Sequence, residues 1–148
     1  MTTTTPHKPL RLVPGVHRAA HRISTYIADD ARLTMSQAEA HILTHVLTLG
    51  ESPIADLHAA FGHRRSTLTS IMDRLAARGF ITRKPSASDR RTFIIALTAA
   101  GQKAARRALA ALSAFEQQVS THVTASELKG FDAVLRAMAA IPRRRPSE

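Results

Sequence analysis

The sequence contains no cysteine and no tryptophan, and only 4% of its 148 residues are aromatic. Without cysteine the chain cannot form disulfides, thiolate nucleophiles, iron–sulfur clusters, cysteine-ligated zinc sites or thiol-based oxidation sensors. Any metal site would therefore have to use histidine and carboxylate ligands. The length suits one domain with a hydrophobic core of its own, which argues against a multidomain enzyme.

Long apolar runs are also lacking. No stretch approaches the roughly 18 consecutive apolar residues that a membrane-spanning helix needs. Residues 1–12 lack the apolar core of a signal peptide. We therefore expect a soluble, cytoplasmic protein that does not contact a membrane.

Motifs of catalytic sites are missing as well. The sequence contains no G-x-S-x-G, H-E-x-x-H, P-loop or dinucleotide-binding pattern, and its acidic residues are scattered singly rather than paired. We therefore expect neither enzyme activity nor a bound cofactor.

Positive charge is what the sequence has in excess. Its 21 lysines and arginines against 11 acidic residues give a formal net charge of +10, and residues 52–97 hold five of these ten excess charges. A basic surface gains affinity for a polyphosphate by releasing the counterions condensed on it. Concentration of the charge in one middle segment is typical of a nucleic-acid-binding module inside a larger scaffold.

Apolar periodicity predicts a mainly α fold in the order α-α-α-α-β-β-α-α. Residues 1–15, with four consecutive threonines and three prolines, are expected to be a flexible arm, and residues 142–148 a basic tail. Between them we expect a single domain over 16–141. Its helices are expected at about 16–32, 36–50, 53–61, 65–78, 99–119 and 125–141, and the strands of a hairpin at 80–83 and 92–97.

Capping signals mark several helix starts. Ser36 with Glu39 forms a capping box, and a second box begins at Thr124. Ser52 is expected to cap the short third helix, with Pro53 in its first turn. The long terminal helices have more apolar surface than the compact middle segment can cover, which predicts a subunit partner.

The third and fourth helices are short and close together. Gly62 stands between them, where a left-handed residue would end the third helix. Two such helices joined by a tight turn that contains glycine form a helix-turn-helix. Together with the hairpin that follows, this predicts a winged helix-turn-helix.

Residues 52–101 contain a series of short motifs in a fixed order. They are Asp73-Arg74-Leu75, Arg78-Gly79-Phe80-Ile81-Thr82-Arg83, Asp89-Arg90-Arg91 and Leu97-Thr98-Ala99-Ala100-Gly101. This segment closely resembles the winged-helix core of MarR-type transcriptional regulators, and the helix order and total length match that family too. One departure is His63-Arg64-Arg65, which stands where the family often has an acidic or serine cap before the recognition helix.

The resemblance implies a two-fold symmetric homodimer that binds DNA, represses transcription and is released by a small ligand. It implies a winged-helix lobe over about 36–98 and dimerisation helices over about 16–32 and 99–141. The two recognition helices of such a dimer address successive major grooves. We therefore expect a pseudo-palindromic operator in double-stranded DNA, with half-sites about 10 bp apart.

The expected recognition helix, residues 65–78, turns its apolar positions inward and its polar ones outward. Arg65 has the reach to pair with a guanine edge, and Ser66 or Ser70 can bond a base or a phosphate. The alternative for the arginines at its start is a solvated surface cluster. Asp73 would repel phosphate, so we expect it to hold a nearby arginine. The candidate DNA-binding residues are Arg64, Arg65, Ser66, Thr67, Thr69, Ser70 and Arg74.

The hairpin is the expected wing, and its candidate residues are Arg83, Lys84, Asp89, Arg90 and Arg91. The resemblance implies that an aspartate orients an arginine that enters the minor groove, where the potential of a narrow A·T-rich groove attracts a guanidinium. The spacing favours Arg91 without excluding Arg90. Arg83 and Lys84 would lie near the DNA backbone, or would form a solvated basic edge that prevents strand pairing.

Histidines are the remaining candidates for a ligand site. The family's effector pocket takes aromatic or lipophilic anions, and helix placement by resemblance suggests His17, His21, Tyr26 and His41 as its lining. Two pairs, His17 with His21 and His41 with His45, are four residues apart on the expected helices, as metal ligands are. Zinc-responsive members of the family also use histidines in the fifth helix, and residues 99–119 contain none. We therefore expect no metal site.

Two alternatives stay open for the function. One is an architectural or weakly specific DNA-binding protein without an effector, which would discriminate little between sequences. The other is a zinc-responsive regulator of the same family.

Overall fold

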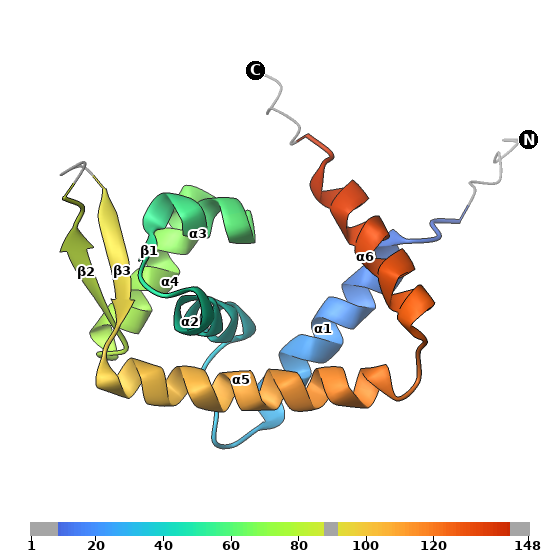
Figure 1. The fold of residues 1–148 in the computed structure, drawn as a ribbon, viewed down its shortest axis with the longest axis horizontal. Coiled ribbons are helices and arrows are strands. Elements are labelled where there is room, and N and C mark those ends of the chain that lie inside the picture. Colours follow the sequence, from blue (N-terminus) through green and yellow to red (C-terminus); the bar gives the residue numbers. More distant parts are fainter. Residues whose placement is uncertain (1–8, 88–91, 143–148) are drawn as a thin grey trace, which may run out of the picture. The chain divides into compact units, whose positions relative to one another are not determined.

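The computed structural model describes residues 9–87 and 92–142. The chain divides into two compact units, Met1–Ser113 and Ala114–Glu148, and each is described by itself. Figure 1 shows the elements as a ribbon. In chain order they are α1 (Val13–Asp29), α2 (Gln37–Leu49), β1 (Ser52–Pro53), α3 (Ile54–Phe61), α4 (Arg65–Ala77), β2 (Ile81–Pro85), β3 (Phe93–Leu97), α5 (Ala99–Ser120) and α6 (Ala125–Ala139).

The mainly α order predicted from the sequence is confirmed, with a small sheet in place of a simple hairpin. Helix α1 begins at Val13 rather than at residue 16, because a proline is tolerated in the first turn of a helix. Pro14 and Gly15, which the sequence assigned to the arm, are therefore helical. In the described part of the chain, no helix combines the length and the hydropathy that crossing a bilayer requires.

Helix α1 ends three residues earlier than expected, and a short polar loop follows it. Asp30, extended at ψ 101°, accepts hydrogen bonds from Arg32 through both carboxylate oxygens, at 2.9 and 2.8 Å. These bonds, together with one from the Arg32 backbone, lower the pKa of Asp30 to about 2. The loop leads into α2, whose capping box at Ser36 and Glu39 is present as predicted.

The sheet has three antiparallel strands in the order β1-β3-β2. Strand β1 was not predicted, because two residues are too few to show an alternating pattern. Ser52 pairs with Ile95 and its hydroxyl donates to the carbonyl of Gly50 at 3.0 Å. The prediction that Ser52 caps α3 is therefore wrong: Pro53 is the cap residue, and no side chain caps that helix.

The core of the first unit lies between α2, α4, the sheet and the start of α5. Helix α4 buries the apolar face that its periodicity predicted, and Gly62 ends α3 in the left-handed conformation, at φ 60°. Burial of such side chains stabilises a fold by about 1.5–3 kcal/mol each. The buried cluster consists of Ile42, Leu43, Val46, Leu57, Leu68, Ile71, Met72, Leu75, Ile81, Ile95, Ala104 and Ala105.

The junction between β3 and α5 is held by Thr98 and Gly101. The Thr98 hydroxyl donates to the carbonyl of Gly79 at 2.6 Å and accepts from the N–H of Gly101 at 2.9 Å. The N–H of Thr98 donates to the carbonyl of Phe80 at 3.1 Å. A Cβ on Gly101 would lie 1.8 Å from that same carbonyl oxygen. The backbone after α4 can therefore approach α5 this closely only because residue 101 is glycine.

The second unit contains the end of α5 and all of α6. Thr124 and Glu127 form the capping box that the sequence predicted for α6. None of the residues of α6 is buried within the chain, although many are apolar. Leu128, Phe131 and Leu135 are 42%, 53% and 39% exposed. This exposed apolar stripe corresponds to the apolar surface of the terminal helices that the sequence predicted to exceed what the middle segment can cover.

Candidate nucleic-acid interface

Helix α4 presents a continuous polar face to solvent. Leu68, Ile71, Met72 and Leu75 are buried on the other side, so the helical repeat leaves the intervening positions outside. All seven candidate residues of α4 and its N-cap are exposed, and these include Ser66, Thr69 and Ser70, which the sequence predicted to face outward. The seven are Arg64, Arg65, Ser66, Thr67, Thr69, Ser70 and Arg74.

The hydroxyl groups on this face are partly used within the helix. Thr69 donates to the carbonyl of Arg65 at 2.9 Å, and Ser70 donates to the carbonyl of Ser66 at 3.1 Å. Their oxygens keep lone pairs that can accept a hydrogen bond from an amino group, and the Thr69 methyl group can contact another methyl group. The helix surface is therefore suited to contacts with base edges.

Two arginines at the start of α4 have no such internal partner. Arg64 is the N-cap residue, extended at φ −62° and ψ 148°, and no side chain caps the helix. Within residues 9–87 and 92–142, neither the Arg64 nor the Arg65 guanidinium forms a hydrogen bond or ion pair. Both groups are thus available to an anion, next to the positive end of a helix dipole.

Two acid–base pairs connect the wing strand β2 to its surroundings. Arg83 donates to the Asp73 carboxylate at 2.5 Å, which confirms that Asp73 holds an arginine of the wing. Lys84 pairs with Glu51 at 2.8 Å. Strand β2 is thus tied to α4 on one side and to the segment before β1 on the other. The remaining wing candidates, Asp89, Arg90 and Arg91, lie outside the described residues.

Arg74 points to a different partner. Its Nε donates to Glu39 of α2 at 3.2 Å, and Arg78 lies 3.7 Å from the same carboxylate. Burial acts to raise the pKa of Glu39, but hydrogen bonds from Ser36 and Arg74 outweigh it, so the pKa is below its ordinary value. The sequence identified Glu39 only as a helix cap. Its arginine partners are too far along the chain for helix periodicity to reveal them.

The candidate ligand residues are spread over α1 and α2. His17 and His21 are exposed, and Tyr26 and His41 are half-buried. His45 packs edge-on against Phe61, with ring centroids 5.2 Å apart. Among the residues that the structure describes, no three metal-ligating side chains gather at one point.

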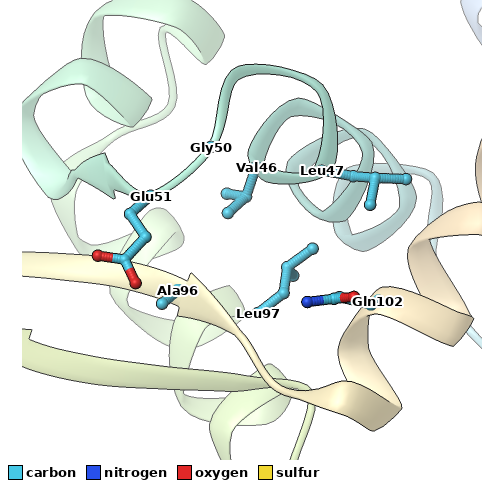
Figure 2. A pocket seen from close by; sticks show the side chains of 7 residues that line it. All are labelled: Val46, Leu47, Gly50, Glu51, Ala96, Leu97 and Gln102. Atoms are coloured by element: carbon cyan, nitrogen blue, oxygen red, sulfur yellow. The ribbon is translucent and has the colours of Figure 1, made fainter.

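A shallow pocket of about 220 Å³ lies elsewhere, between the end of α2, β3 and the first turn of α5. Figure 2 shows its largely apolar lining, with the Glu51 carboxylate and the Gln102 amide on opposite sides in that view. None of the four residues predicted to line an effector pocket belongs to it.

Comparison with known proteins agrees with the winged helix-turn-helix fold described above. The chain matches the model of the MarR family over residues 35–93, and it matches none of the curated proteins with which it was compared.

Three solved structures illustrate the similarity in fold. NadR in complex with 4-hydroxyphenylacetate is 19% identical, with a TM-score of 0.78, covering 95% of this chain and 100% of that chain. MepR of S. aureus in a DNA-binding conformation is 17% identical, with a TM-score of 0.76, and the match covers 87% of this chain and 96% of that chain. A mutant MarR from E. coli complexed with operator DNA is 18% identical, with a TM-score of 0.71, and the match covers 86% of this chain and 94% of that chain. The winged-helix segment of this chain, residues 35–93, therefore belongs to the MarR family.

Proposed function

We propose that the protein is a transcriptional regulator that binds double-stranded DNA sequence-specifically, as a homodimeric repressor released by a small ligand. The observation that supports this most directly is the exposed polar face of α4, with Arg64 and Arg65 at its start and the basic strand β2 tied to it through Asp73. A MarR protein with this fold is complexed with operator DNA in its crystal structure.

In this proposal α4 enters the major groove. Arg65 reads a guanine edge, Ser66, Thr67, Thr69 and Ser70 contact bases or phosphates, and Arg64 contacts the backbone. The wing approaches the adjacent minor groove, with an arginine at its tip and Arg83 and Lys84 nearer the phosphates. Because Asp73 already holds Arg83, the wing and the recognition helix meet DNA as one unit.

Selection of bound duplexes from a random-sequence pool tests this proposal. We expect enrichment of a pseudo-palindrome with half-sites about 10 bp apart, because a symmetric dimer addresses two successive major grooves. The enriched duplex should bind at least about 10³-fold more tightly than random duplex of equal length. Equal affinity for both would identify an architectural binder and contradict sequence-specific regulation.

The homodimer is proposed on the exposed apolar stripe of α6. Placing a carboxylate there, with Phe131→Asp, should leave a monomer, because an unpaired charge would be buried in the interface. Sedimentation measures the result. Lys129→Glu, an exposed charge change on the same helix, should stay dimeric, and a dimeric Phe131→Asp would contradict this interface.

The ligand is proposed to be a small aromatic or lipophilic molecule. NadR with the same fold is complexed with 4-hydroxyphenylacetate, and the candidate contacts here are His17, His21, Tyr26 and His41. Such a ligand can release DNA only if it binds the DNA-incompetent conformation more tightly than the competent one.

A further inference from the structure

Glu39 is the most deeply buried charged side chain that contacts the recognition helix. Its side chain is only 6% exposed, whereas those of its two arginine partners, Arg74 and Arg78, are 55% and 31% exposed. A buried carboxylate is tolerated when charged partners and hydrogen bonds satisfy it, and removing one partner is costly. Here one carboxylate of α2 is satisfied from the C-terminal half of α4.

The contacts of Glu39 use both of its oxygens. Oε2 accepts the N–H of Ser36 at 2.8 Å, which completes the capping box of α2. Oε1 accepts Nε of Arg74 at 3.2 Å, and Nη1 of Arg78 lies 3.7 Å from Oε2. The group that fixes the start of α2 is therefore the same group that holds the last turn of α4, through Arg74, and its C-cap residue, Arg78.

A further contact strengthens the connection between the two helices. Nη2 of Arg78 donates to the hydroxyl of Thr34 at 2.9 Å, and the Arg78 guanidinium lies 4.6 Å from the centre of the Phe80 ring. Arg78 is thus held by the loop before α2 and by Phe80, three residues after the end of α4. Together these contacts restrain the guanidinium more than a single exposed ion pair would.

We propose that Glu39 is a positioning residue for DNA recognition: it sets the orientation of α4 relative to α2 and keeps Arg74 and Arg78 from binding phosphate indiscriminately. The inference deepens the proposed function and rests on it. Loss of the Glu39 charge releases two cations on the recognition helix and loosens that helix. Specific binding then falls while non-specific binding rises.

The variant Glu39→Gln tests this in the full-length protein. Its amide oxygen can still accept the Ser36 N–H, so the cap is kept and only the charge is lost. The probes are the duplex enriched from the random pool and a random duplex of equal length. We expect the ratio of the two affinities to fall about tenfold or more, and the affinity for random duplex to rise about two- to fivefold at low salt.

Glu127→Gln is the matched control. Glu127 completes an identical capping box with Thr124. The described contacts of Glu127 include no arginine. This variant should keep the parent ratio. If Glu39→Gln also keeps it, or lowers both affinities equally, Glu39 supports only the fold and the proposal is overturned.

Hydrogen exchange without DNA gives a second measurement that does not depend on the proposed function. In Glu39→Gln the amides of residues 65–77 should exchange about tenfold faster than in the parent protein, and in Glu127→Gln they should not. Unchanged exchange would overturn the positioning role. If instead the parent protein fails to discriminate any duplex while exchange changes as expected, the proposed function fails and the link between the helices stands.

A milder variant covers the case in which Glu39→Gln does not fold. Thr34→Val removes the exposed acceptor of Arg78 and leaves the buried carboxylate in place. It should lower the affinity ratio in the same direction, about two- to threefold. A parent-like ratio in this folded variant would overturn the part assigned to Arg78.

Discussion

Replacing Gly101 by alanine should destabilise the protein by about 2–4 kcal/mol, the size typical of a severe steric clash in a packed region. The added Cβ would lie 1.8 Å from the Phe80 carbonyl oxygen and 2.7 Å from the carbonyl carbon. Both atoms belong to backbone, which cannot rotate away as a side chain can. Thermal or denaturant unfolding measures the effect.

Gly130 provides the control for Gly101. It also lies inside a helix, α6, but a Cβ there would meet nothing within 4 Å. Because alanine has the higher helix propensity, Gly130→Ala should be neutral or stabilise by up to about 1 kcal/mol. If the two variants unfold alike, the close approach at Gly101 is not as described, and the junction between β3 and α5 must be looser.

Arg65→Ala should weaken binding of the enriched duplex by about 1–3 kcal/mol, which is roughly five- to 150-fold. A bidentate arginine–guanine contact discriminates one base pair, so specificity should relax at one position of each half-site. Arg65 is exposed in the first turn of α4, so the substitution should leave the fold intact. Competition against duplexes with single base changes measures both effects.

Arg107→Ala is the control for Arg65→Ala, because it tests whether an effect on DNA binding comes from the position of the lost charge or only from the lower net charge. Arg107 is an exposed cation on α5, outside the candidate interface, and its loss changes the net charge by the same amount. We expect a small decrease in affinity that is equal for all duplexes, because long-range electrostatics carries no sequence information. Arg65→Ala behaving in the same way would show that Arg65 contacts phosphate rather than a base.

Much of this fold follows from local patterns. The two capping boxes predicted the starts of α2 and α6, because each box is satisfied by side chains three residues apart. The periodicity of α4 predicted its buried face and therefore its exposed one. Strand β1 could not be predicted, because its pairing partner Ile95 is distant in sequence and its own pattern is too short.

The candidate site likewise has a part that local sequence patterns predict and a part that they do not. The exposed arginines and hydroxyls of α4 follow from helix geometry, and Asp73 was expected to hold an arginine because its charge is unsuited to DNA. The partners themselves were not predictable. Arg83 for Asp73 and Arg74 for Glu39 depend on how the wing and α2 pack against α4, which no pattern within one element encodes.

The two hydrogen bonds of the Thr98 hydroxyl couple the movements of the elements that they join. By bonding Gly79 on one side and Gly101 on the other, the hydroxyl joins the end of the recognition helix, the root of the wing and the first turn of α5 into one stiff corner. A small tilt of the first turn of α5 would therefore move the end of α4 and the start of β2 together with it, because the Thr98 hydroxyl is bonded to both sides of the junction.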